Sequence, residues 1–213
     1  MNTMTAFTCA ALFAAYATSA MAQNVRITTF KSESTFTLNG QTFTVSRDTD
    51  TTATLQGEFA LTSRACPPDC LQPLVAADGV ATFGELEVLS FLEDRVTDGT
   101  GLLLDARAPV DFAVGHIPGA VNVPVTTLVP ENRFRVDILR ALGAEPNADG
   151  TLDFSNAMAL TFYSGGVWSD DAPTAIDQLI LAGYPANKLF YYRGGMQAWL
   201  HVGLTAITPQ NPG

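Results

Sequence analysis

The residues best placed for chemistry lie in a short loop, 164–169, with the sequence Ser-Gly-Gly-Val-Trp-Ser. A short apolar and β-branched run, 159–163, precedes the loop, and Asp170, Asp171 and Pro173 open a helical pattern after it. A glycine-rich loop that leads into a helix N-terminus turns backbone N–H groups inward and can cradle an anion. The same surroundings would stabilise a cysteine thiolate, but the loop contains no cysteine. The sequence therefore predicts an anion cradle that lacks a thiol nucleophile.

Ser164 is the first residue of this loop, and a serine hydroxyl becomes a nucleophile only when a neighbouring base activates it. The chain has two histidines, His116 and His201, whose positions suit a turn and a helix. Because no Ser-His-Asp set is visible, a serine-loop hydrolase is the least supported interpretation. The two histidines stand far apart without a second ligand nearby, so we expect no metal site and no cofactor.

A second candidate is the pair Cys66 and Cys70, which lies in the proline-rich segment 63–73. A disulfide between them would close a very small loop and contribute about 2 kcal/mol at most. The pair could also be redox-active or accept sulfur, because small disulfide loops can be strained and reducible. We favour the structural disulfide, since redox motifs usually begin a helix and these cysteines lie among prolines.

The first 22 residues resemble a secretory signal peptide. An apolar run at 6–17 is followed by Thr-Ser-Ala-Met-Ala at 18–22, so the mature chain is expected to begin at Gln23. The run is too short to span a bilayer, although a membrane anchor is the competing interpretation because no Lys or Arg precedes it. The mature chain keeps an even pair of cysteines, which predicts a disulfide and a periplasmic or secreted location.

The chain has a formal net charge of −10, and the expected cleavage removes no charged residue. This acidic balance argues against nucleic acid and against anionic membrane surfaces as partners. After cleavage we therefore expect no membrane association.

Two segments before residue 97 have clear local patterns. Phe36, Leu38, Phe43 and Val45 flank Asn39-Gly40, which predicts a β-hairpin, and threonine-rich alternation predicts β structure on to residue 61. Thr82-Phe83-Gly84-Glu85 predicts a capping box. The buried positions expected in the helix after it are Val88, Leu89, Leu92 and Val96, and the exposed ones are Glu87, Glu93 and Asp94.

Strands and helices alternate through the rest of the chain. Buried strands are predicted at 102–105, 159–163 and 188–192, helices at 133–142 and after 170, and a surface loop at 143–156. In the helix at 133–142, Phe134, Ile138 and Leu142 are expected to share the buried face. This alternation implies an α/β fold, with a parallel sheet that carries helices on both faces.

Two motifs resemble the rhodanese-like family over roughly residues 80–205. The residues of the first motif that match its pattern are Asp105, Arg107, Phe112, Gly115, His116, Ile117, Pro118, Gly119, Ala120, Asn122 and Pro124. The second motif is Gly194-Gly195 followed by Ala198-Trp199. Asp105 and Arg107 are expected to form an ion pair and His116 a tight turn with Gly119 at positive φ, so these residues mainly support the fold.

The resemblance implies a rhodanese-like fold and an activity that depends on one residue. In that family the loop after the central strand begins with a cysteine, which takes a sulfane sulfur as a persulfide and passes it to a thiophile. Ser164 stands at this position, followed by the loop residues Gly165, Gly166, Val167, Trp168 and Ser169. A serine cannot form a persulfide, and the loop also lacks the Arg or Lys that often holds the anionic donor.

These observations predict four regions: a signal peptide (1–22), an N-terminal β region with the Cys-x3-Cys loop (23–75), a rhodanese-like domain (76–208) and a tail (209–213). The first functional hypothesis is a catalytically degenerate domain that binds a protein partner or a small sulfur-containing anion in sulfur or redox metabolism. The alternative is a periplasmic sulfurtransferase or thiol-redox protein that works through Cys66 and Cys70. The position of these two sulfurs relative to Ser164 discriminates between the two hypotheses.

Overall fold

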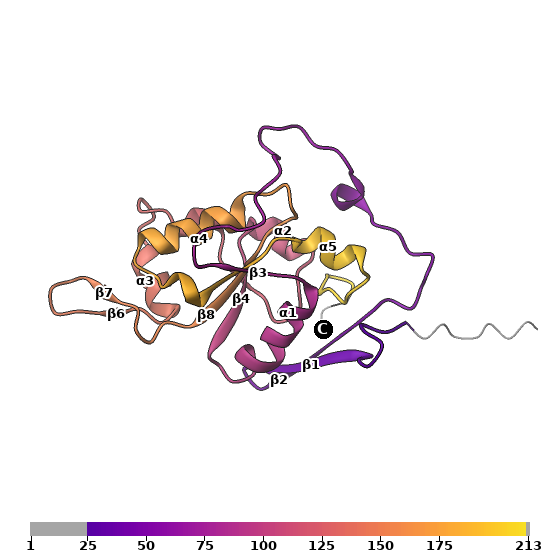
Figure 1. Cartoon of the computed structure of the whole chain (residues 1–213), viewed down its shortest axis with the longest axis horizontal. Coiled ribbons are helices and arrows are strands. Elements are labelled where there is room, and N and C mark those ends of the chain that lie inside the picture. The colour runs from indigo at the N-terminus through magenta and orange to yellow at the C-terminus, as the bar shows by residue number, and fades with distance from the viewer. Residues whose placement is uncertain (1–24, 212–213) are drawn as a thin grey trace, which may run out of the picture.

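Five parallel strands form the central sheet of the computed structural model, which describes residues 25–211 (Figure 1). Their order across the sheet is β3-β9-β8-β4-β5. The strands are β3 (Ala81–Phe83), β4 (Gly101–Asp105), β5 (Val121–Asn122), β8 (Ala159–Tyr163) and β9 (Leu189–Tyr192). The predicted parallel sheet is therefore confirmed.

The three central strands end level with one another. Asp105 of β4 is paired with Tyr163 of β8, and Tyr163 is paired with Tyr192 of β9. The loops that follow these strands consequently meet at one edge of the sheet, which is where open α/β sheets bind their ligands. The loop that begins at Ser164 lies at this edge.

Helices cover both faces of the sheet, as predicted. The α-helices are α1 (Glu85–Phe91), α2 (Pro109–Val114), α3 (Arg135–Ala141), α4 (Asp171–Leu181) and α5 (Gly195–His201). Short helical turns are η1 (Gly57–Ala60), the π-helical η2 (Leu92–Val96) that continues α1, η3 (Val125–Thr127) and η4 (Ala186–Lys188). Among residues 25–211, no helix is long and apolar enough to cross a membrane.

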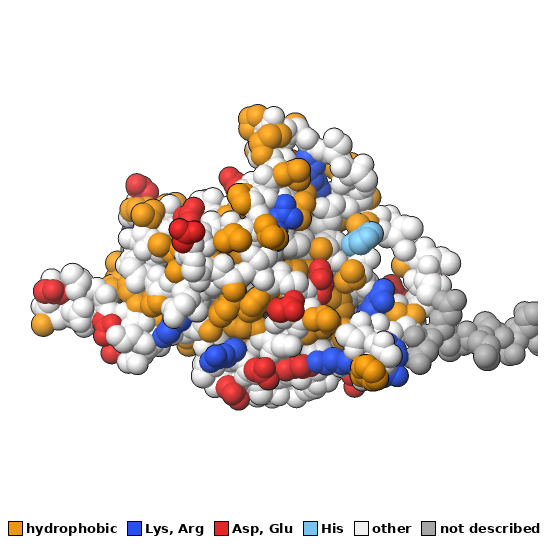
Figure 2. All heavy atoms as spheres, viewed as in Figure 1, with side chains coloured by type: hydrophobic (Ala, Val, Ile, Leu, Met, Phe, Trp, Pro, Cys, Tyr) orange, Lys and Arg blue, Asp and Glu red, His pale blue; other side chains and the backbone are white. Residues whose placement is uncertain are grey.

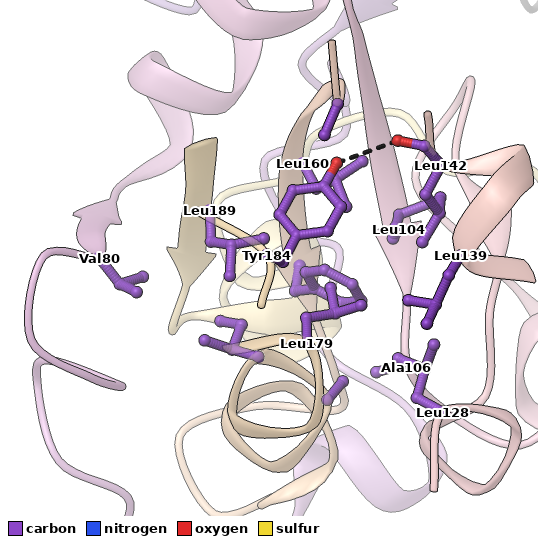
Figure 3. Packing of buried hydrophobic residues seen from close by; sticks show 14 of the residues in the cluster. Val80, Leu104, Ala106, Leu128, Leu139, Leu142, Leu160, Leu179, Tyr184 and Leu189 are labelled. Atoms are coloured by element: carbon purple, nitrogen blue, oxygen red, sulfur yellow. Dashed lines mark hydrogen bonds between the residues drawn. The ribbon is translucent and has the colours of Figure 1, made fainter. Parts of the chain in front are cut away.

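Each face of the sheet has its own hydrophobic core. Figure 3 shows the first core, where Leu104 and Leu160 of the sheet pack with Leu179 of α4 and Leu139 of α3. Tyr184 closes this core: its hydroxyl lies 2.7 Å from the carbonyl oxygen of Met158 and 3.1 Å from that of Leu142, so the two acceptors share its one O–H. The side chains of the three central strands, β9, β8 and β4, are mostly buried on both faces, as expected for parallel strands.

The second core lies under α1, α5 and an N-terminal hairpin. The hairpin is β1 (Glu33–Leu38) and β2 (Gln41–Ser46), and it adds Phe36 and Val45 to a cluster that contains the fully buried Trp199. Asn39 and Gly40 have φ values of 51° and 80°, so the predicted hairpin turn is confirmed.

The prediction of β structure up to residue 61 is wrong. Residues 48–75 form a long segment, called the strap below, whose one regular element is the η1 turn, and Figure 1 shows it extending away from the sheet. The carboxylates of Asp48 and Asp50 accept hydrogen bonds from the backbone N–H groups of Asp50 and Thr52. These local turns replace strand pairing, because the backbone donors are satisfied within the segment.

The predicted capping box at 82–85 is also wrong. Thr82 lies in β3 and donates its hydroxyl to the carbonyl of Leu74. The helix begins two residues later, with Gly84 as N-cap and the Glu87 carboxylate accepting the Gly84 N–H at 3.0 Å. The buried face of α1 and η2 is as predicted, but Glu93 is half-buried because it binds residues of the N-terminal region.

Two further differences concern the segment around α3. Phe134 is 52% exposed. Its backbone N–H donates a hydrogen bond to the side-chain oxygen of Asn132, which places Phe134 just before the helix rather than on the buried face of the helix. The expected loop at 143–156 contains a small hairpin, β6 (Glu145–Pro146) and β7 (Leu152–Asp153). The predicted signal peptide and its cleavage site lie outside the described residues.

Candidate functional site

The loop 164–169 joins β8 to α4 and is held from behind by α5. The carbonyl oxygen of Ser164 accepts the N–H of Met196 at 3.0 Å, and that of Gly165 accepts the N–H of Gln197 at 2.9 Å. Gly195 has a φ of 57°, and a Cβ there would overlap the Ser164 carbonyl oxygen. The Gly-Gly pair of the second motif thus allows α5 to approach the loop closely.

Four consecutive N–H groups of the loop have no acceptor within the described part of the chain. They belong to residues 165–168, between Ser164 and the Ser169 N–H, which bonds to the carbonyl of Gly166 at 3.0 Å. Buried backbone donors are normally satisfied, so a row of unsatisfied donors suits an anionic or carbonyl-bearing ligand. This geometry agrees with the anion cradle expected from the sequence.

Trp168 folds back over the two glycines of the loop. Its ring lies so close to Gly165 and Gly166 that a Cβ on either glycine would overlap it. The indole N–H donates to Oε1 of Gln197 at 2.9 Å, which fixes the ring in this position. The tryptophan ring is therefore packed against both glycines of the loop.

The helix entrance after the loop is stabilised by the side chain of Ser169. Asp170 occupies the N-cap position without a side-chain cap hydrogen bond. Instead, the Ser169 hydroxyl donates to the Asp171 carboxylate at 3.0 Å and lies 3.4 Å from the Asp171 N–H. Burial raises the pKa of Asp171, the Ser169 hydrogen bond opposes this shift, and the charge of Asp170 adds to it. The site thus keeps a carboxyl group where an anionic donor would arrive.

Asp105 and Arg107 form the predicted ion pair, and it is buried. Nη2 of Arg107 lies 2.6 Å from Oδ2 of Asp105, Nε lies 3.0 Å from Oδ1, and the side chains are almost inaccessible. Nη2 also donates to the carbonyl of Gly115 at 2.7 Å. Burial alone would lower the pKa of Arg107, but the hydrogen bonds and charge of Asp105 raise it. The pair braces the segment after β4 and leaves no free guanidinium for a ligand.

His116 has the structural role that the sequence suggested. Its ring stacks on Phe112 with centroids 3.8 Å apart, and Nδ1 lies 3.0 Å from the Phe112 carbonyl oxygen. Its backbone pairs with Ile207, and Gly119 has the expected positive φ of 75°. His201 is the last residue of α5. Neither histidine is hydrogen-bonded to Ser164 within residues 25–211.

The strap lies over the loop and contacts it at two neighbouring residues. The N–H of Gln72 donates to the carbonyl of Val167 at 2.9 Å. The guanidinium of Arg64 lies 3.7 Å from the centre of the Trp168 ring, a cation–π contact. Arg193, which follows β9, holds the Gln72 carbonyl at 2.7 Å. No sequence pattern linked Arg64, Gln72 or Arg193 to the loop.

Cys66 and Cys70 form a disulfide between the two strap residues that touch the loop. Both cysteines line a cleft of about 1740 Å³, together with Val167 and Trp168. Ser164 is 1% exposed and is not part of the cleft wall. The structure thus brings the two cysteines and the middle of the loop to one cleft, and Ser164, the first loop residue, does not line it.

Residues 88–201 match the family model described as the rhodanese-like domain, and the chain belongs to this family. This confirms the family and fold that the two sequence motifs indicated.

Among known proteins, the chain is similar to a tRNA 2-selenouridine synthase from Bordetella bronchiseptica, with 32% identity over 107 residues. The match covers 48% of this chain and 26% of that enzyme, so the chain spans about a quarter of the length of this relative. A human single-domain sulfurtransferase is 24% identical, with 57% of this chain and 96% of that chain covered and a TM-score of 0.38. A thiosulfate sulfurtransferase from Pseudomonas aeruginosa is 23% identical, with 62% of this chain and 21% of that chain covered and a TM-score of 0.41.

Proposed function

We propose that this chain is an exported, catalytically degenerate rhodanese-like protein that acts as a binding module in sulfur or redox metabolism. The observation that carries the proposal is the loop 164–169, which keeps four unsatisfied N–H donors but offers no thiol. A binding surface is thus retained where the covalent chemistry of the family has no sulfur atom to use.

The surroundings of Ser164 support the same proposal. Its side chain is buried, and within residues 25–211 no hydrogen bond joins its hydroxyl to a histidine or a carboxylate. A serine without a base cannot replace the thiolate of a sulfurtransferase. Asp171 adds a carboxyl group at the helix entrance, which disfavours a strongly anionic donor such as thiosulfate.

The ligand-binding region of this proposal is the cleft between the loop and the strap. The candidate ligands are a small sulfur-containing anion, held by the loop donors, or a segment of a protein partner. The net charge of −10 disfavours nucleic acid. We propose a periplasmic or secreted location, on the basis of the N-terminal sequence pattern.

The test is a thiosulfate:cyanide sulfurtransferase assay on purified mature protein, with an active rhodanese as the positive control. We expect no turnover above the buffer rate, because a persulfide on the loop requires sulfur. Turnover at a rate typical of enzymes would contradict the proposal. Isothermal titration with thiosulfate and with sulfite then measures whether the loop still binds anions.

A second candidate function is sulfur transfer or thiol redox chemistry through Cys66 and Cys70. It is favoured by one observation, that both cysteines line the cleft shared with Val167 and Trp168. Cyanolysis of protein-bound sulfane sulfur distinguishes the candidates. Sulfur that is released from the wild type, and is lost in the Cys66→Ala, Cys70→Ala double variant, would support the second candidate.

A further inference from the structure

The cleft beneath the strap is larger than a small ligand needs. Figure 1 shows the strap passing around α5, and the cleft measures about 1740 Å³, whereas small-molecule pockets measure roughly 300–1000 Å³. We propose that the cleft binds an extended, basic peptide segment of a partner protein. The peptide pairs its backbone with strap residues 54–56 and buries its apolar side chains against the cleft wall. The peptide site rests on the proposed function, which treats this cleft as the binding region.

The cleft is preformed, because the strap is tied down at three places. At its start, the N–H of Asp48 donates to the carbonyl of Gly203 at 2.7 Å. In its middle, Nε2 of Gln197 donates to the carbonyl of Phe59 at 2.9 Å. At its end, Gln72 is bonded to the loop. A preformed site spares the ligand the entropic cost of ordering the strap.

Between the first two of these ties, residues 49–57 form an arch whose backbone is available for pairing. Every hydrogen bond that the arch makes stays within the strap. Thr54, Leu55 and Gln56 line the cleft, and their backbone N–H groups have no acceptor within residues 25–211. Gln56 has the extended backbone of a strand, with φ −119° and ψ 163°. An extended segment with free backbone groups is a template for a further strand.

The cleft also offers an apolar surface to the side chains of such a peptide. Ala198, Leu200 and Val202, from α5 and the residue after it, line the cleft and are half-buried. Figure 2 shows apolar side chains on the outermost bend of the strap, and Leu61 and Leu71, which line the cleft, are 53% and 79% exposed. Alternate side chains of an extended peptide point to the same side, so one set can be buried here while the backbone pairs with the arch.

The charged residues of the cleft favour a basic ligand. Asp48, Asp50 and Asp69 line the cleft, and none of them forms an ion pair within the described residues. Arg47 and Arg64 also line it, but each donates to a backbone carbonyl of the chain, at 2.7 and 2.6 Å. The carboxylates are therefore available to lysine or arginine side chains, and the net charge of −10 attracts a basic peptide from solution.

The test uses a short, fluorescein-labelled peptide of alternating lysine and leucine as the probe. It is titrated into purified mature protein, and binding is followed by fluorescence anisotropy. We expect saturable binding and slower hydrogen exchange at the amides of residues 54–56 in the complex, because these amides gain acceptors. The same peptide with every backbone nitrogen methylated should bind much more weakly, because the methyl groups block strand pairing.

A matched pair of leucine variants tests whether the peptide lies in the cleft. Leu71→Ser should weaken binding about tenfold, because the peptide would bury this side chain. Leu181→Ser is the control, since Leu181 is similarly exposed, at 77%, but belongs to α4 and does not line the cleft. The control should leave the affinity unchanged.

A matched pair of charge variants separates the cleft from general attraction to an acidic protein. Asp50→Asn with Asp69→Asn should weaken binding about fivefold, as expected for exposed ion pairs. Glu131→Gln with Asp177→Asn removes the same charge from residues that do not line the cleft, and it should have a clearly smaller effect.

The proposal is overturned if the probe does not bind, if the two members of either pair weaken binding equally, or if hydrogen exchange at residues 54–56 is unchanged in the complex. None of these readings depends on sulfur chemistry. Turnover of thiosulfate would refute the proposed function and leave the peptide site standing. Binding of thiosulfate or sulfite without binding of the probe would refute the peptide site alone.

Discussion

The substitution Asp105→Asn tests whether the buried ion pair braces the segment that follows β4. It removes the negative charge but preserves the size of the side chain, and it leaves the Arg107 guanidinium in a site where that residue is 5% exposed. Breaking a buried pair costs about 3–5 kcal/mol, because the remaining charge is uncompensated. Arg107 keeps its hydrogen bond to the Gly115 carbonyl, so the lower end of this range, about 3 kcal/mol, is expected.

The consequence for the protein is large and measurable. A domain of this kind has a free energy of unfolding of roughly 5–15 kcal/mol, so the variant loses a substantial part of it. At about 2–4 °C per kcal/mol for a chain of this length, Tm should fall by roughly 6–12 °C. Urea unfolding followed by far-UV circular dichroism at neutral pH measures the change, and the m value should stay the same.

The matched control is Asp137→Asn. Asp137 pairs with Arg140 at 3.9 Å on the surface, where the two side chains are 73% and 50% exposed. This variant should lose less than about 0.5 kcal/mol, because exposed ion pairs contribute little. Equal losses for the two variants would refute the assignment of a bracing role to Asp105. Replacing both partners, Asp105→Leu with Arg107→Met, should recover part of the loss, since no charge is then left buried.

Three further predictions concern the loop and the N-terminal segment. Ser164→Cys should give thiosulfate turnover that is at least about 100-fold slower than that of an active rhodanese, because the thiol is buried and basic loop residues are missing; equal rates would contradict this account. Burial raises the pKa of Asp171 above its ordinary 3.8, so ionisation of Asp171 destabilises the fold as the pH rises through its raised pKa. Asp171→Asn should therefore gain stability relative to wild type at pH 7, and the gain should vanish in acid. Asp153→Asn is the control, in which stability relative to wild type at pH 7 should fall rather than rise, because a hydrogen bond from Ser155 lowers the pKa of Asp153. Intact mass of the periplasmic protein should correspond to a chain that begins at Gln23, and a mass that includes residues 1–22 would refute the predicted cleavage.

The features that the sequence predicted correctly depend on local chemistry. The strand at 159–163 is a run of residues buried on both faces, and the turn at Asn39-Gly40 requires positive φ at both positions. The pair Asp105 and Arg107 lies two residues apart at a strand end. In each case the physical cause acts within a few residues, so the pattern is visible in the chain itself.

The features that it missed depend on partners far away in the sequence. Threonine-rich alternation suggested strands up to residue 61, but a strand forms only where another strand offers backbone groups, and the described residues pair β2 with β1 alone. The contact of Arg64 with Trp168 joins residues from two unrelated segments. The role of the Ser169 side chain at the start of α4 is not visible in the sequence, because Ser169, Asp170 and Asp171 are all suitable capping residues.

The junction between the N-terminal hairpin and the C-terminal segment determines when the chain can finish folding. The N–H of Ser46, at the end of β2, donates to the Thr205 hydroxyl, and the Ser46 carbonyl accepts the Thr205 N–H. These residues are 159 positions apart in the sequence. The hairpin is synthesised early, yet its docking site is complete only after α5 has been made. Its apolar face must therefore wait, unprotected by the second core, until almost the whole chain has been synthesised.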